Sequence, residues 1–173
     1  TPRTHRVVET VLDARVRELH CLLRVSSLLA EREAPFPDLL QQLVSILPPA
    51  YRYPEIARVR VRIEDRSWQA SDFRETAWEQ TSVISTVARK VGSVQVCYLE
   101  QRPEEAEGPF LEEERELLDA VGEMLAQRVE RERAMEALRV NEQRLETVLG
   151  SAPIMLWSMV STGSVSLARG RIL

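Results

Sequence analysis

The sequence predicts an α+β fold in which helices cover one face of an antiparallel sheet. Two long segments, 5–31 and 108–153, carry apolar residues at helical spacing and contain no proline away from their ends. Between them lie short stretches in which apolar and polar residues alternate, separated by turn residues. Strands that follow one another, with helices before and after them, are typical of an antiparallel sheet packed against helices.

The first long segment predicts a helix with a heptad-like stripe. Its apolar residues recur at alternating spacings of four and three, with single polar residues among them. The stripe contains Val8, Leu12, Arg15, Leu19, Leu22, Ser26 and Leu29, and it is widened by Val16 and Leu23. The residues that we expect at a dimer interface are Leu12, Leu19, Leu22 and Leu29.

A short helix and four strands are expected between the two long helices. Asp38 is placed to cap a helix that runs to Leu47, where two prolines end it. The turn signals at 64–67 and 89–92 separate stretches rich in β-branched residues. The expected strands are 56–63, 68–70, 81–88 and 93–99.

The first expected strand shows the clearest alternation in the chain. Its apolar side chains, Val59, Val61 and Ile63, fall on one face, so the three arginines between them share the other face. Those arginines are Arg58, Arg60 and Arg62. A row of guanidinium groups could hold an anion. The alternative is that the row is solvated and paired with neighbouring carboxylates.

The second long segment predicts a helix of some forty residues. Glu112, Glu113 and Glu114 lie in its first turns, where the helix dipole favours carboxylates, and Gly150 ends it. Such a helix reaches about 60 Å, roughly twice the width of a small domain, so we expect only its first half to pack on the domain.

The same helix carries a heptad pattern with polar interruptions. Residues Leu117, Met124, Arg131, Leu138 and Leu145 recur every seven positions, with Ala120, Gln127, Ala134, Asn141 and Val148 between them. This pattern predicts a parallel coiled coil and a homodimer, with Leu138 and Leu145 in the interface. The alternative is a single charged surface helix.

Composition limits the classes of function. The chain has 173 residues, with 44% hydrophobic and 29% charged residues, which suffices for one domain with extensions. A net charge of −4 predicts no nucleic-acid partner, and the apolar runs are too short for membrane insertion. Cys21 and Cys97 form no CxxC motif, which predicts a reducing, cytoplasmic setting. Because the chain begins with Thr, we expect a fragment of a longer protein.

The order of these elements resembles a GAF domain, a small sensory module of bacterial multidomain sensors. The resemblance covers roughly residues 20–131. The stretches that carry it are FPDLLQQLVSILPPAYRYPEIARVRV, DFRETAWEQ, VGSVQVCYLE and GPFLEEERELLDAVGEMLAQRVERE. The next stretch, ALRVNEQRLETVLGSAPIMLWSM, is similar to the junction that leads into a PAS domain.

These likenesses imply a division of the chain and a role for it. The expected parts are a linker helix (1–19), a GAF-like domain (20–130), a coiled-coil helix (131–149) and the truncated start of a PAS domain (150–173). The resemblance implies a regulatory module that is not itself an enzyme. It would relay a signal to a downstream PAS and effector domain of a histidine kinase or of a cyclic-di-nucleotide cyclase or phosphodiesterase. The alternatives are a ligand-free dimerisation spacer and a small cysteine-dependent redox enzyme.

The resemblance also implies where a ligand pocket would lie. In the family the pocket is on the sheet face opposite the terminal helices. Residues 71–80 would help roof it, and this connection is short here, so we expect a small or closed pocket. The aromatic residues that could line it are Tyr53, Trp68, Phe73, Trp78 and Tyr98. The alternative is that these aromatics fill the core.

Motifs for a cofactor or for catalysis are missing from the sequence. The Asn-Lys-Phe-Asp-Glu signature of cyclic-nucleotide-binding GAF domains does not occur, and Cys21 and Cys97 fall in regular elements unsuited to bilin attachment. The two histidines, His5 and His20, lie on the first helix. We therefore expect no cofactor, no metal site and no catalytic residue.

Overall fold

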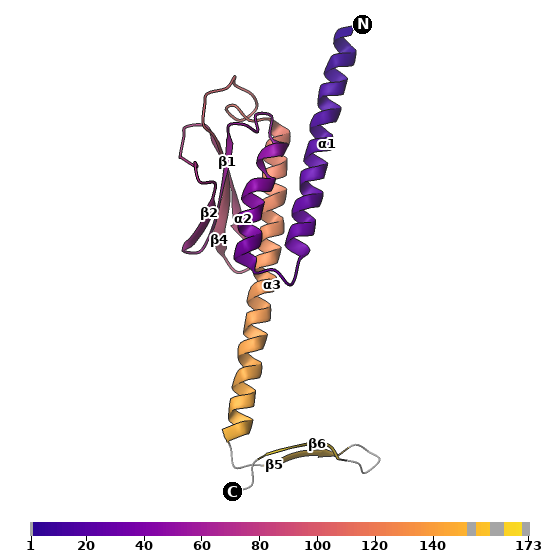
Figure 1. Cartoon of the computed structure of the whole chain (residues 1–173), viewed down its shortest axis with the longest axis vertical. Helices are drawn as coiled ribbons and strands as arrows, with labels where there is room; N and C mark the ends of the chain where they lie inside the picture. The colour runs from indigo at the N-terminus through magenta and orange to yellow at the C-terminus, as the bar shows by residue number, and fades with distance from the viewer. Residues whose placement is uncertain (1, 152–154, 160–164, 171–173) are drawn as a thin grey trace. The chain divides into compact units, whose positions relative to one another are not determined.

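A computed structural model describes residues 2–151, 155–159 and 165–170, and the surroundings of the side chains from 14 to 148 (Figure 1). It confirms the α+β class, with a four-stranded antiparallel sheet and helices on one side of it. The chain divides into two compact units, Thr1–Val129 and Glu130–Leu173. The helices are α1 (Pro2–Ala30), α2 (Phe36–Ile46), the 3₁₀ turn η1 (Pro48–Ala50) and α3 (Glu112–Ser151). The strands are β1 (Ala57–Ile63), β2 (Arg66–Gln69), β3 (Glu79–Ser85), β4 (Lys90–Tyr98), β5 (Met155–Met159) and β6 (Val165–Gly170).

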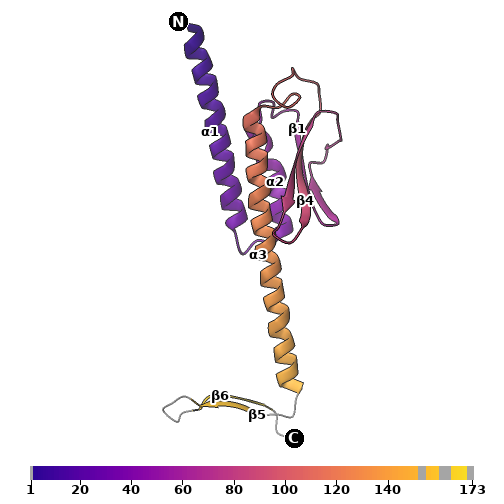
Figure 2. The ribbon, with the colours of Figure 1, turned by 180° about the vertical axis from the view of Figure 1, so that it is seen from behind.

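The sheet of the first unit has the order β2-β1-β4-β3, and every neighbouring pair is antiparallel. The register places Val59 opposite Val96 and Val61 opposite Val94, so these four valines share one face. Figures 1 and 2 show α1, α2 and the first half of α3 on a single side of this sheet. Helices thus cover one face of the sheet. The other face, which we call the outer face, is contacted by the segment between β2 and β3.

The core lies between the helices and the valine face. Every second residue of a strand faces this core, and so does every third or fourth residue of a helix. For this reason the apolar alternation of the strands and the apolar stripes of the helices could both be seen in the sequence. Its central members include Val25 of α1, Leu40 and Leu43 of α2, Val59, Val61, Val94 and Val96 of the sheet, and Leu118, Val121 and Leu125 of α3, all of them buried. Burying a side chain of this size stabilises a fold by about 1.5–3 kcal/mol.

A buried arginine joins the three helices at one end of the first unit. The guanidinium carbon of Arg128, on α3, lies 5.3 Å from the ring centroid of Phe36 at the start of α2. Its Nη2 donates a hydrogen bond of 3.2 Å to the carbonyl oxygen of Glu31, just after α1. The negative end of the α1 dipole and the aromatic face both favour a cation at this position.

The start of α2 differs from the sequence expectation. Asp38 was expected to cap this helix, but the helix begins at Phe36, and no side chain caps it. Pro35 occupies the N-cap position and Pro37 the first turn, where the fixed φ of proline suits a helix and its missing N–H is not needed. Asp38 lies within the first turn, where the helix dipole stabilises its charge.

The turn between β3 and β4 also lies earlier than expected. Residues 89–92 were read as the turn, whereas the chain reverses between Thr86 and Arg89. The backbone N–H and the hydroxyl of Thr86 each donate a hydrogen bond of 3.0 Å to the carbonyl oxygen of Arg89. Gly92 therefore lies inside β4, opposite Ile63 of β1.

In the second unit the structure describes the end of α3 and one hairpin. Every residue from 134 to 148 is exposed. Strands β5 and β6 pair antiparallel, with Trp157 opposite Ala168. Residues 152–154 and 160–164 lie outside the described residues.

Candidate functional site

The outer face of the sheet carries the arginine row predicted from the sequence. Arg58, Arg60 and Arg62 lie on this face of β1, and the register places Cys97 and Gln95 of β4 opposite the first two. The segment between β2 and β3, residues 70–78, contacts this row through several side chains. We call this segment the β2–β3 connection.

Arg60 is the centre of the polar network on the outer face. Its side chain donates from Nε and Nη2 to Oε1 of Gln95, at 3.0 and 2.5 Å, and from Nη2 to Oε1 of Glu75 at 2.7 Å. The ring of Phe73 lies over the guanidinium, 4.5 Å from its carbon to the ring centroid. Gln95 is itself fixed because its amide donates to Glu79 at 2.6 Å. Only 8% of Arg60 is exposed, so this arginine of the row is buried rather than solvated.

The two flanking arginines pair with carboxylates of the β2–β3 connection. Arg58 donates from Nε to both carboxylate oxygens of Asp72 at 2.7 Å, and Arg62 lies 3.5 Å from Glu75. The hydrogen bond from Arg58 lowers the pKa of Asp72, and the hydrogen bond from Arg60 lowers the pKa of Glu75. The arrangement agrees with the alternative in which neighbouring carboxylates pair with the arginine row.

Both cysteines are buried and lie in environments that disfavour the thiolate. The Cys97 thiol donates to the carbonyl oxygen of Arg74 in the β2–β3 connection at 3.1 Å, and burial raises its pKa. Burial raises the pKa of Cys21 to about 11. A cysteine nucleophile reacts as the thiolate, which burial disfavours at both positions.

The five aromatic residues proposed as pocket lining do not share one face of the sheet. Tyr98 lies on the helix-covered face and meets the ring of Tyr53 edge to face at 5.7 Å between centroids. Trp68, opposite Val61, points to that same face, and Trp78 is half-buried against the core. Phe73 lies on the outer face over Arg60. The structure thus brings Tyr53 and Tyr98 together and separates Phe73 from them.

A buried carboxylate beneath Tyr98 was not anticipated. Glu114 accepts hydrogen bonds from the backbone N–H of Arg52 at 2.6 Å and of Leu111 at 2.8 Å, and from the Tyr98 hydroxyl at 3.1 Å. Burial raises its pKa despite these three donors. The bond to Leu111 is the return half of a capping box, in which a glutamate at the third helical position binds the N–H before the helix. The sequence placed Glu112, Glu113 and Glu114 together in the first turn of this helix. It gave no sign that Glu114 alone would be buried.

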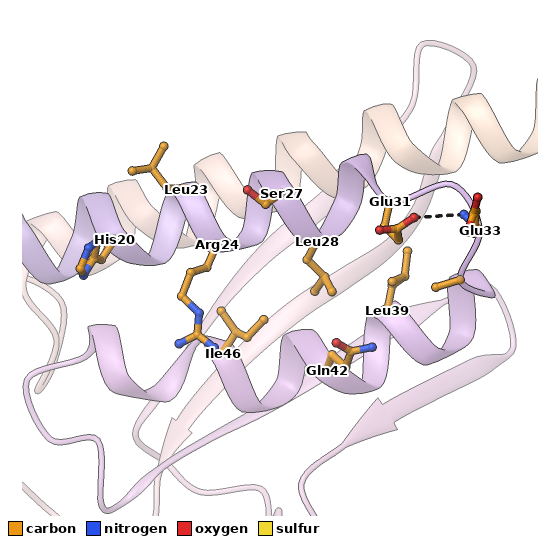
Figure 3. A pocket seen from close by; sticks show the side chains of 11 residues that line it. His20, Leu23, Arg24, Ser27, Leu28, Glu31, Glu33, Leu39, Gln42 and Ile46 are labelled. Carbon is orange, nitrogen blue, oxygen red and sulfur yellow. Dashed lines mark hydrogen bonds between the residues drawn. The ribbon is translucent and has the colours of Figure 1, made fainter.

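An open groove of about 890 Å³ runs between α1 and α2 (Figure 3). Its apolar lining comes from Leu23, Leu28, Leu39 and Ile46, and its polar lining includes His20, Arg24, Ser27, Gln42, Glu31 and Glu33. Leu23 is 64% exposed, although its neighbour Val25 on the same helix is fully buried. Thus α1 has one apolar face in the core and a second one toward solvent.

The predicted dimer residues divide between these two faces. Leu29 is buried in the core and Leu22 is half-buried against it, so their surfaces are already covered within one chain. Leu19 is exposed, and with Val16 and Leu23 it forms a continuous stripe, which we call the α1 stripe. The α1 stripe is therefore rotated from the predicted heptad because part of that heptad is needed for the core. The side chain of Leu12 lies outside the described residues.

A second exposed stripe lies on the C-terminal half of α3. Leu138 and Leu145 were predicted at an interface, and both are exposed, at 60% and 62%. Met135 and Val148 continue the line at helical spacing. We call these four residues the α3 stripe.

The described residues hold neither a metal-binding cluster nor a membrane-spanning helix. In this part of the chain no three or more histidine, cysteine or acidic residues gather as a metal would require. None of its helices combines the length and the apolar character needed to cross a bilayer. Among known proteins, no family model matches the chain, and a search of curated proteins finds no match either.

Proposed function

We propose that this chain is a GAF-like relay module that dimerises through its flanking helices and passes a signal to a downstream PAS and effector domain. The single observation that carries the proposal is the pair of exposed apolar stripes, one on α1 and one on α3. The order of helices and antiparallel strands is compatible with the GAF-like part of the proposal.

The physical reason for dimerisation is the spacing of the exposed side chains. In the α1 stripe, Leu19 lies three residues after Val16 and Leu23 four residues after Leu19. In the α3 stripe, Leu145 lies seven residues, one heptad, after Leu138. Large apolar side chains in such a line are hydrated in a monomer and buried when a second helix covers them. A second copy of the chain supplies the matching stripes.

In this proposal the relay consists of a change in packing between paired helices. The helices before and after the sheet each carry a stripe, and within the first unit Arg128, in the middle of α3, donates a hydrogen bond to the residue that follows α1. In the proposal, a change in the packing of α1 reaches α3 through this contact within the first unit. Burial raises the pKa of both cysteines, which speaks against the alternative of a cysteine-dependent redox enzyme.

A ligand-free dimerisation spacer is the second candidate. It is favoured by one observation, the occupation of the arginine row by Asp72 and Glu75 of the same chain. Both candidate functions require the same homodimer. They differ only in whether a ligand changes the packing of its helices.

The test is the molar mass in solution, measured by light scattering coupled to size-exclusion chromatography. We expect a dimer at tens of micromolar for the wild-type chain. Leu138→Asp places a charge in the α3 stripe and should weaken association at least about tenfold, which corresponds to ~1.4 kcal/mol.

Val140→Asp is the matched control. Val140 is also an exposed apolar residue of α3, but it lies two positions from Leu138 and off the stripe. This variant should dimerise like the wild type. A wild-type chain that remains monomeric, or equal effects of the two substitutions, would remove the basis of the proposal.

A further inference from the structure

We propose that the free edge of β2 binds an extended segment of a partner protein, which joins the sheet as an added strand and carries an acidic residue on either side of an apolar one. This interface is separate from the dimer and uses none of the residues of the α1 and α3 stripes. Three features of the molecule carry it: the backbone of β2, a cavity beside the end of β2, and the charges along this edge.

The backbone of β2 is hydrogen-bonded on one side only. The N–H of Ala70 donates to the carbonyl oxygen of Val59 at 3.2 Å, and alternate residues of an antiparallel pair bond in the same way. Trp68 therefore bonds to β1, whereas the N–H and C=O groups of Ser67 and Gln69 point away from it. No hydrogen bond to these outward groups is formed among the described residues. Because β2 lies at the border of the sheet (Figure 1) and contains no proline, another strand can pair with it.

The opposite edge of the sheet, formed by β3, is covered. The N–H of Tyr98 donates to the carbonyl oxygen of Trp78 at 2.9 Å, so by the same alternation the carbonyl of Thr81 points outward from β3. Arg115 of α3 donates from Nη1 to that carbonyl oxygen at 2.9 Å. A charged side chain that occupies an edge in this way opposes pairing with another chain. Within the described part of the chain the edge of β2 has no such cover, so the two edges differ.

An open cavity of about 470 Å³ lies beside the end of β2 and gives an added strand room for a side chain. The side chains of Trp68 and Ala70 point to the helix-covered face of the sheet, because they alternate with Ser67 and Gln69. A residue placed opposite Ala70 in the added strand points to the same face and enters the cavity. The cavity is bordered there by Gln41, Val44 and Ser45 of α2, by Pro48 of η1, and by Ala70 and Ser71.

The charges along this edge favour an acidic segment. Among the described residues, Arg66 is the only charged one in β2, and Arg58 is the only charged one that lines the cavity. Opposite charges directly across a strand pair stabilise it, and so does a β-branched residue beside an aromatic one. The matching strand therefore has an acidic residue opposite Arg66, a β-branched residue opposite Trp68 and a second acidic residue opposite Ala70.

The geometry of Arg58 suits this second acidic residue. Its hydrogen bonds to Asp72 and to the carbonyl oxygens of Glu55 and Ala57 leave from Nε and Nη1. These bonds hold the guanidinium in place, and Nη2 donates none of them. A carboxylate in the cavity can accept from this nitrogen.

The probe is a capped synthetic peptide in which threonine alternates with glutamate, valine and glutamate, so that it begins and ends with threonine. Its binding to the full chain is measured by fluorescence anisotropy, and we expect saturable binding. Methylation of the backbone nitrogens of the two threonines next to the valine removes the donors that pair with Ser67 and Gln69. This change should weaken binding at least about tenfold. The same methylation at the two glutamates, whose N–H groups point away from β2, is the matched control and should leave binding unchanged.

Gln69→Pro makes the complementary change in the chain. Proline removes the outward N–H and is tolerated where the N–H side of an edge strand faces solvent, so the sheet should remain intact by circular dichroism. Peptide binding should weaken at least about tenfold, whereas Gln69→Thr keeps the N–H and should bind like the wild type. If the proline variant does not fold, the methylated peptides on the wild-type chain decide the question alone.

The charge requirement is tested with a second peptide that has glutamine in place of both glutamates. It should bind at least about threefold more weakly to the wild-type chain. Arg66→Gln should weaken binding of the glutamate peptide and leave that of the glutamine peptide unchanged. Arg32→Gln makes the same change of charge at an exposed residue outside the sheet and should alter neither.

The outcomes separate this interface from the dimer. Absence of saturable binding at about 1 mM peptide would overturn the proposal, and so would equal binding of the two methylated peptides. A fall in the molar mass of the chain on Gln69→Pro would show that a second copy, not a partner protein, occupies the edge. The Leu138→Asp chain should bind the peptide like the wild type, so a failure of the dimer proposal would not be confused with a failure of this one.

Discussion

At the scale of single residues, Gly92 shows how closely β1 and β4 approach. A Cβ at this position would lie 2.0 Å from the carbonyl oxygen of Arg62 and 3.1 Å from the Cα of Ile63. Because the obstacle is backbone, Gly92→Ala must separate the two strands. We expect it to lower the free energy of unfolding by about 2–3 kcal/mol, measured by urea denaturation. Ser93→Ala, at the next residue of β4, should cost less than about 1 kcal/mol, and similar losses for the two variants would contradict this account.

The sequence alone suggested a different role for Gly92, as the end of a turn. A glycine after Arg89, Lys90 and Val91 fits a turn and a close strand contact equally well, since both need the absence of a side chain. Only the register with β1 distinguishes them. Glu114 was ambiguous in the same way, because three successive glutamates suit a helix start and one of them is buried.

Glu114 should make stability depend on pH in an unusual direction. Burial raises its pKa in the folded chain, so the folded state holds its proton more tightly than the unfolded state. The free energy of unfolding should therefore fall as pH rises from the ordinary glutamate range through the raised value. In Asp72 and Glu75 the pKa is lowered, and their contribution is lost only as pH falls below the ordinary range.

Glu114→Gln tests this sign. Glutamine keeps one acceptor oxygen and cannot ionise, so the variant should lose the decline above the ordinary glutamate range, although its absolute stability shifts by about 1 kcal/mol. Urea unfolding at a series of pH values from 4 to 8 measures the slope. Glu113→Gln, one position earlier in the helix, is the control and should keep the wild-type slope.

At the scale of elements, periodicity predicted the type of the three α-helices and of the four strands of the larger sheet, but not every boundary. The helical stripes and the alternation in β1 arise from burial on one face, which a single sequence records directly. The start of α2 and the β3–β4 turn depend on Pro35 and on the Thr86 hydroxyl, local contacts that compete with equally plausible signals nearby. The arginine row could be predicted from the sequence because its members alternate with the apolar residues of β1. Its partners Asp72 and Glu75 were not, because their contacts depend on the path of the β2–β3 connection.

The α1 helix shows a further limit of periodicity. Its apolar residues serve two faces, the core through Val25 and Leu29 and the solvent side through Val16, Leu19 and Leu23. A heptad drawn along the sequence takes members from both faces. Only the packing of α1 against α2 and the sheet reveals which leucines remain exposed.

At the scale of the whole molecule, a dimer of this kind should link stability to concentration. When two chains bury their stripes only in the folded state, association stabilises that state by mass action, and the melting temperature rises with protein concentration. We expect this rise for the wild-type chain between about 1 and 100 μM, measured by circular dichroism at 222 nm. Leu23→Asp combined with Leu138→Asp should flatten it, because both stripes then carry a charge. At the lowest concentration the wild type and the double variant should melt at similar temperatures, since Leu23 and Leu138 are exposed in the single chain and contribute little to its core. A large difference between them at that concentration would mean that the two leucines support the monomer fold, and a wild-type melting temperature independent of concentration would mean that the stripes have another partner.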